Sequence, residues 1–220
     1  MKNTTSQAAP SLWKKATIIL TTILVPMLMM QSCKKDEVSP LDTANYKTFN
    51  SNMRKLWSDH MQWTYSTVDA FFNNSDGLQA QLNRLLQNQK DIGAAIVPYY
   101  GQAAGDQLTA LLTDHINKAV PVLTAAKNND QAALNTALAD WYANAEQIAD
   151  FLSAANPNWA QSDMRHMMKM HIDQTTAYAV DLLKKDYTAA VQKYEEAHNH
   201  MLEMADDLSE GIAKQFPSKF

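Results

Sequence analysis

Residues 56–64 decide the fold and read Leu-Trp-Ser-Asp-His-Met-Gln-Trp-Thr. Around them, apolar side chains recur from Phe49 onward at alternating spacings of four and three residues, which is typical of one face of a helix in a bundle. His60 stands in the middle of this face, with Trp57 and Trp63 on either side. We therefore predict a long amphipathic helix that carries a histidine at its mid-height.

The same helical spacing recurs along the rest of the chain. Clusters rich in Asn, Asp, Gly and Pro interrupt it, and no run alternates with the two-residue period of a strand. Residues 90–105 look like a loop, because Pro98 and Gly101 punctuate them. The predicted helices cover about residues 42–72, 78–89, 105–127, 131–155, 163–185 and 186–215. The fold class is all-α, an antiparallel up-and-down helical bundle of about five long helices and one short helix.

The N-terminal segment is a targeting signal and not part of the fold. Three lysines precede a fifteen-residue apolar run at residues 16–30, which is too short for a comfortable transmembrane helix. Small residues then lead to Cys33, the only cysteine of the chain, and this arrangement resembles a relaxed bacterial lipobox. The resemblance implies that residues 1–32 are a signal peptide and that Cys33 is acylated, with palmitate or a similar chain, which anchors the protein to a membrane.

The residues after Cys33 indicate where the protein is anchored. Residues 33–37 read Cys-Lys-Lys-Asp-Glu, which resembles the lysine-then-acid start of surface-exported Bacteroidetes lipoproteins and implies an outer-membrane or cell-surface location. The alternatives are an ordinary secreted protein with an unpaired thiol and an uncleaved signal anchor. With Cys33 acylated, no thiol is left for a disulfide, a metal or a nucleophile.

The mature part, residues 33–220, is mildly acidic. It carries 16 of the 19 Lys and Arg and all 23 Asp and Glu, a net charge of −7, which argues against nucleic acid as a partner and against electrostatic adhesion to anionic lipid. Residues 33–43 are polar, contain Pro40 and form a tether. Residues 44–220 are long enough for one good core, so we predict a single helical-bundle domain.

Polar residues stand at the centres of several predicted helices. His60, His115 and His171 each lie near the midpoint of a different helix. Because midpoints share one height in an antiparallel bundle, we expect a polar layer of these three histidines, with Asn144 and His198 beside it. The expected walls of this layer are Trp57, Trp63 and Trp141.

Three imidazoles that converge from different helices suit a transition metal such as zinc, copper or iron. Asp59 and Asp114, each just before a histidine of the layer, are candidates for an outer shell. The alternative is that the three are ordinary core histidines, which bond to neighbouring hydroxyl or carbonyl groups. A buried unpaired imidazole costs about 1–3 kcal/mol, so both interpretations require a shared partner.

Other chemistry has weaker support. Met164, Met168 and His166 suggest copper, but both methionines fall on the core face and His166 points away from His171 around the helix. No hydrolase or nucleotide-binding motif is present, and we assign no catalytic residue. Use of a bound metal by an enzyme of unknown class stays open, because a sequence does not show an open coordination position.

Six runs of sequence resemble a bacterial family of all-helical secreted or lipid-anchored proteins. They are WSDHMQWT, LLQNQKDIGAAIVPYYG, LLTDHI, WYANAEQIADFL, MHIDQTT and HMLEMADDLSEGI. Members of that family often bear the label glycosyltransferase, which we do not transfer, because sugar-nucleotide transferases usually need an α/β nucleotide-binding fold and this chain predicts none. In the last run the resemblance points to His200, whereas the helical spacing favours His198.

The sequence as a whole predicts a cell-envelope lipoprotein whose bundle binds a transition metal or a small ligand at a histidine layer. The alternative is a non-catalytic structural or interaction protein.

Overall fold

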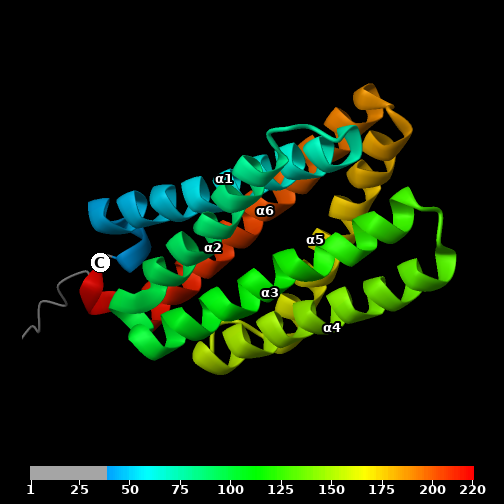
Figure 1. Ribbon diagram of the computed structural model, residues 1–220. Coiled ribbons are helices and arrows are strands. Elements are labelled where there is room, and N and C mark those ends of the chain that lie inside the picture. Colours follow the sequence, from blue (N-terminus) through cyan, green and yellow to red (C-terminus); the bar gives the residue numbers. More distant parts are fainter. Residues whose placement is uncertain (1–38) are drawn as a thin grey trace, which may run out of the picture. The chain divides into compact units, whose positions relative to one another are not determined.

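The computed structural model describes residues 39–220 and shows six long helices (Figure 1). They are α1 (Ala44–Asn73), α2 (Leu78–Tyr100), α3 (Gln102–Lys127), α4 (Gln131–Ala155), α5 (Gln161–Lys184) and α6 (Tyr187–Gln215). Two short 3-10 helices, η1 (Pro40–Asp42) and η2 (Pro217–Lys219), flank them. The predicted signal peptide, Cys33 and most of the tether lie outside the described residues.

Local side-chain and backbone chemistry sets several of the helix ends. The side chains of Thr43, Asp130 and Asp186 each accept a hydrogen bond from a backbone N–H in the first turn of the helix that follows, which satisfies one of the donors that a helix leaves unpaired. Asn74 and Lys185 end α1 and α5 in the left-handed conformation. These positions agree with the turn clusters in the sequence.

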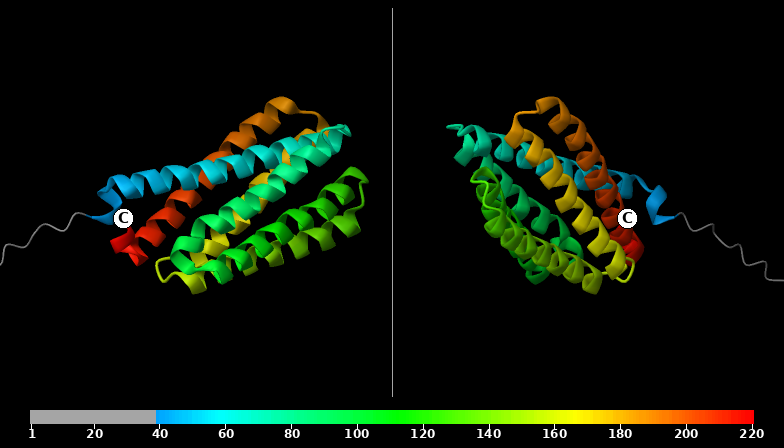
Figure 2. Two further views of the ribbon diagram at one scale, coloured as in Figure 1. Left: turned by 60° about the vertical axis from the view of Figure 1, so that its left-hand side comes forward. Right: turned by 90° about the vertical axis from the view of Figure 1, so that its right-hand side faces the viewer.

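The six helices form a closed ring in chain order. Each helix packs against the next, and α6 returns to pack against α1. Short turns make neighbours antiparallel, so α1, α3 and α5 run in one direction and α2, α4 and α6 in the other (Figures 1 and 2). The start of α1 and the C-terminus lie together at one end, the proximal end, where the rings of Tyr46 and Phe220 are 6.1 Å apart. The opposite end, with the α1–α2, α3–α4 and α5–α6 turns, is called the distal end below.

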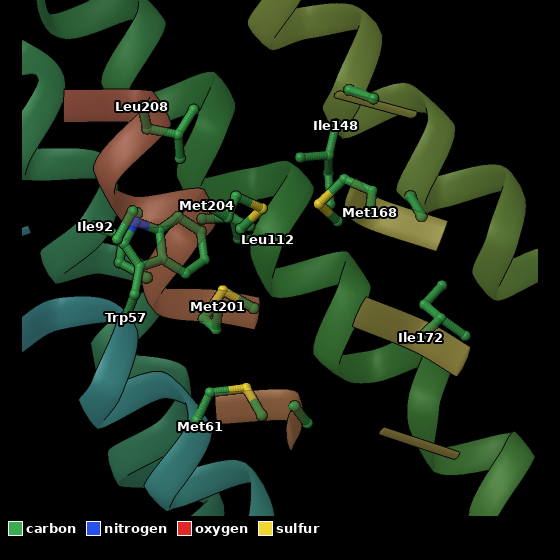
Figure 3. Packing of buried hydrophobic residues seen from close by; sticks show 14 of the residues in the cluster. Trp57, Met61, Ile92, Leu112, Ile148, Met168, Ile172, Met201, Met204 and Leu208 are labelled. Atoms are coloured by element: carbon green, nitrogen blue, oxygen red, sulfur yellow. The ribbon is translucent and has the colours of Figure 1, made fainter. Parts of the chain in front are cut away.

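The all-α bundle predicted from the sequence is confirmed. All six helices contribute to one apolar core, and Figure 3 shows Trp57 of α1 beside Met201 and Met204 of α6, with Met168 of α5 opposite Leu112 of α3. No helix among residues 39–220 is long and apolar enough to cross a membrane.

The second helix differs from the prediction. Residues 90–100 continue α2, so the bundle has six long helices and not five long helices and one short one. Pro98 lies in the last turn of α2, where Gly101 closes the helix through an N–H bond to the carbonyl of Val97, 2.9 Å away. The glycine at position 93 is buried where α2 meets Gly105 of α3, so it serves helix packing and not a loop.

The buried face of α1 is also wider than the predicted one. Trp57 and Thr64 are buried, whereas Leu56 and Trp63 are only half-buried. A helix inside a closed ring contacts two neighbours as well as the centre, so its apolar face exceeds a single seam.

Candidate functional site

Three histidines meet at the centre of the ring, one from each of α1, α3 and α5. His60, His115 and His171 are 2%, 2% and 3% exposed. The ring centroid of His171 lies 5.6 Å from that of His60 and 5.7 Å from that of His115. The alternate helices of the ring point the same way, so residues near their midpoints reach one height, as the sequence predicts.

The amide of Asn144 on α4 fixes the orientation of His115. Nδ2 of Asn144 donates to the carbonyl of Leu111 and to Oδ2 of Asp114, each 3.2 Å away, so its Oδ1 is turned to the imidazole. Nδ1 of His115 lies 2.8 Å from this Oδ1 and must donate a proton to it. The neutral ring therefore carries its proton on Nδ1, and Nε2 is left as an acceptor.

A second amide, that of Gln89 on α2, fixes the tautomer of His60, and here the ring proton lies on the other nitrogen. Nε2 of Gln89 donates to the carbonyl of Leu85, 2.8 Å away, and lies 3.3 Å from Nδ1 of His60. An amide nitrogen is only a donor, so Nδ1 of His60 accepts and the ring proton is on Nε2.

All three imidazoles are neutral at pH 7, because burial strongly disfavours their charged forms. Burial, followed by the nearby His115, lowers the pKa of His60 to about 3, and the Asn88 side chain offsets part of that shift. Burial lowers the pKa of His115 to about 4 against the opposing effects of Asn144 and Asp114. The pKa of His171 is well below 6.5, first from burial and then from His60, His115 and His200.

A cavity of about 140 Å³ extends from the histidine layer towards the distal end. Side chains from α1 to α5 line it, and most of them are aliphatic or aromatic. Thr64 and Thr176 also line it, but their hydroxyls donate to backbone carbonyls of their own helices. On the proximal side of the layer, the core cavity beside Trp57 has a volume of about 20 Å³. Native cores contain few voids larger than a water molecule, so the distal cavity is the exception in this core.

Two exposed valines mark where the cavity reaches solvent. Val120 of α3 and Val180 of α5 line it and are 40% and 41% exposed. Phe72 and Leu123, also in its wall, are half-buried. The cavity therefore has an apolar mouth at the distal half of the bundle and a floor at the histidines.

Several polar atoms around the layer are buried without a partner in the protein. They include Nε2 of His115, Nδ1 of His171, Oε1 of Gln89 and the hydroxyls of Thr67 and Thr175. Each such atom costs about 1–3 kcal/mol, and native structures hold few of them. Four of these atoms, on His115, His171, Thr67 and Thr175, belong to residues that line the cavity.

The three imidazoles are not arranged as a finished metal centre. Among residues 39–220, no group of three or more His, Cys, Asp or Glu side chains is placed to hold a metal ion. The ring planes of His115 and His171 meet at an angle of 29°, with their centroids 5.7 Å apart.

The structure separates the other predicted members of the layer. Asp114 is hydrogen-bonded to Asn144 beside His115, whereas Asp59 pairs with Lys55 and Arg84 elsewhere. Nε2 of His198 is 2.9 Å from Oγ of Ser58, in the contact between α1 and α6.

The two histidines of α6 are both half-buried and contact different neighbouring helices. Nε2 of His200 donates to the carbonyl of Met167, 3.0 Å away, one turn before His171 on α5. His200 is close enough to contribute to the lowered pKa of His171. Neither α6 histidine lines the cavity.

The three tryptophans predicted to form the walls of the layer lie in three different environments. Trp141 lines the cavity, with its ring 5.2 Å from that of His115. Trp57 packs edge-on against His60 at 5.8 Å, but on the proximal side of the layer. Trp63 lies outside the site, where the Arg84 guanidinium sits 5.7 Å from its ring; the expectation that it forms part of the wall is therefore wrong.

Sequence reasoning missed Gln89, Asn88 and the cavity itself. The two amides are fully buried on α2, within a stretch whose second half looks like a loop. A signal was available in residues 85–92, where two adjacent amides stand between Leu85 and Ile92 on one helical face.

Comparison with protein-family models, with curated proteins and with solved structures finds no match for this chain. The interpretation of the site therefore depends on its own geometry.

Proposed function

We propose that this protein binds a small, mostly apolar molecule in the distal cavity, against the histidine layer. The observation that supports this most directly is a cavity of about 140 Å³ beside partnerless imidazole nitrogens. An engineered cavity of about this size in another protein, lined by similar side chains, stays dry and takes up benzene. A single-ring molecule is therefore the right size.

The cost of the empty cavity supports a role for it. At about 24 cal/mol per Å³, a void of this volume forfeits about 3 kcal/mol of stability. Leu82 and Leu134 are large side chains in its wall, whereas Ala119, Ala126 and Ala179 in the same wall are small. A protein that keeps such a void gains from a ligand that fills it.

We propose further that the protein acts at the cell envelope, held by a lipid on Cys33. The N-terminal sequence pattern supports this, and labelling with a palmitate analogue, lost in Cys33→Ser, tests it. In that place a lipid-anchored bundle has access to small molecules outside the cytoplasm. We assign no reaction to it.

The purified protein should bind toluene, and filling the cavity should prevent this. Toluene is expected to raise Tm in a saturable way, because a ligand that binds only the folded state stabilises it in proportion to RT ln(1 + [L]/Kd). Ala179→Leu should abolish this rise, because Ala179 is buried in the cavity wall. It should also raise Tm in the absence of toluene.

The matched control is Ala143→Leu, which makes the same change at an exposed position of α4. It should leave both the Tm and the response to toluene unchanged. A response to toluene that Ala179→Leu does not alter would place the ligand elsewhere, and no response to any single-ring hydrocarbon would refute the proposal.

Transition-metal binding is a second candidate function, favoured by the bond from His115 to Asn144. A metal-ligating histidine commonly donates its other ring N–H to an acceptor that orients it, and here Nδ1–H of His115 has that partner while Nε2 is free. Neutral imidazoles bind zinc, copper and iron without first losing a proton.

Metal analysis of the protein, purified without a histidine tag and supplied with zinc, copper and iron, tests this candidate. About one ion per chain is expected if the layer is a metal site, with loss of the ion in His60→Ala and in His171→Ala. His166→Ala is the control, because His166 is exposed on the outer face of α5. A metal content near zero, with an unchanged Tm, would leave only the apolar-ligand function.

A further inference from the structure

The cavity and the tautomer of His115 together specify the chemical class of the ligand. We propose that this site takes a compact, neutral molecule with one ring and one hydrogen-bond donor, such as a phenol, and that Nε2 of His115 accepts that donor. This inference rests on the proposed function, since it concerns the same cavity.

The first step is that His115 offers an acceptor and not a donor. Asn144 receives the proton on Nδ1 at 2.8 Å, and Asn144 is itself held by Leu111 and Asp114. Turning the Asn144 amide over would place its oxygen against two other acceptors, so the network allows one orientation. The tautomer of His115 is thus set by α4 and by the preceding turns of α3.

The second step is that this acceptor has no partner in the protein although its ring lines the cavity. Nε2 of His115 is buried and makes no hydrogen bond, and the residue is among those that form the cavity wall. Trp141, which packs on the same ring at 5.2 Å, has its own indole N–H buried without a bond. A ligand donor that reaches this buried nitrogen from the floor of the cavity would pair with it.

The third step compares this class with charged molecules and with pure hydrocarbons. A charged molecule would lose its hydration in a cavity whose wall is mainly apolar and whose nearest titratable groups are neutral histidines. A pure hydrocarbon would fill the volume but leave Nε2 unpaired. A neutral ring with a hydroxyl or an N–H both fills the volume and pairs Nε2.

Phenol and toluene are the probes that separate these classes, because each has seven non-hydrogen atoms and only phenol carries a donor. The measured quantity is the ratio of the Kd for toluene to the Kd for phenol. In His115→Phe this ratio is expected to fall about tenfold from its value in the wild type, which corresponds to one hydrogen bond of about 1.4 kcal/mol. Comparing ratios between variants cancels the different hydration of the two probes.

His166→Phe is the matched control, since it makes the same change on the exposed face of α5, and it should leave the ratio unchanged. A second measurement uses the wild type alone and does not depend on the variant folding. Phenol, but not toluene, should shift the ¹⁵N resonance of Nε2 of His115, and that resonance should belong to an unprotonated nitrogen before either probe is added.

The outcomes distinguish this inference from the proposed function. If both probes bind and the ratio is the same in His115→Phe and the wild type, the donor inference is overturned and the apolar-ligand function stands. If neither probe binds, both fall. A protonated Nε2 in the free protein would overturn the donor inference alone.

Discussion

Lowering the pH from 7 to 4.5 is expected to unfold this protein, and the three central histidines are the reason. In the folded state the pKa of His60 is about 3, that of His115 about 4 and that of His171 well below 6.5. In the unfolded chain each histidine has an ordinary pKa near 6.5. Below pH 6.5 the unfolded state therefore binds more protons than the folded state.

The sign and size of the effect follow from this difference. The stability that comes from keeping these histidines neutral is complete above pH 6.5 and is lost as the pH falls towards the folded-state pKa values. Each histidine contributes a loss of about 1.4 kcal/mol per pH unit. Three of them over two units give a loss on the order of 8 kcal/mol, comparable with the whole stability of a typical domain, about 5–15 kcal/mol.

Urea unfolding at several pH values, followed by near-ultraviolet circular dichroism, measures this slope. His171→Leu removes one of the three groups and should reduce the slope between pH 6.5 and 4.5 by about a third. His166→Leu, at an exposed position, should not change it. A wild-type protein that is as stable at pH 4.5 as at pH 7 would show that the three imidazoles are not buried neutral groups.

Gly93→Ala is expected to destabilise the protein by about 2 kcal/mol, although alanine is the better helix former. A Cβ at position 93 would lie 1.9 Å from Oγ1 of Thr109 and 2.6 Å from the backbone carbonyl of Gly105. A backbone carbonyl cannot turn away as a flexible side chain can, so α2 and α3 would have to separate. Overpacking of this kind costs about 1–3 kcal/mol or more, against a gain of about 1 kcal/mol in helix propensity.

Thermal unfolding tests this, with Gly77→Ala as the control. At position 77 the new Cβ would meet only the side chains of Gln81 and Ser75, at 3.4 and 3.5 Å, so the change in stability should stay within about 0.5 kcal/mol. Thr109→Ala should restore part of the loss in Gly93→Ala, because it removes the shorter contact but not the carbonyl. Equal effects of the two glycine substitutions would contradict the close contact between α2 and α3.

Gly93 contacts another helix, whereas Gly77 meets only side chains close to it in the chain. This difference explains why part of the fold could be predicted from sequence and part could not. Periodicity and turn residues gave the class of the fold and most helix ends, including the limits of α4, because both depend on residues close together in the chain. The sequence predicts a loop at residues 90–100, because glycine and proline are local breakers. The contact between Gly93 and Gly105 joins two helices, and no local pattern reveals it.

The candidate site, too, could be predicted in part from the sequence. The height of His60, His115 and His171 follows from their positions in helices of similar length, so their meeting was predictable from sequence alone. Which nitrogen of each ring is free depends on Asn144 and Gln89, which come from neighbouring helices.

By itself, then, the sequence determined a helical bundle and a central histidine layer, since spacing along a helix fixes both the face and the height of a side chain. Only the tertiary structure decided that the core is well packed on one side of that layer and hollow on the other. Whether a cavity exists depends on how side chains from five helices pack together, so no single segment of the sequence predicts it.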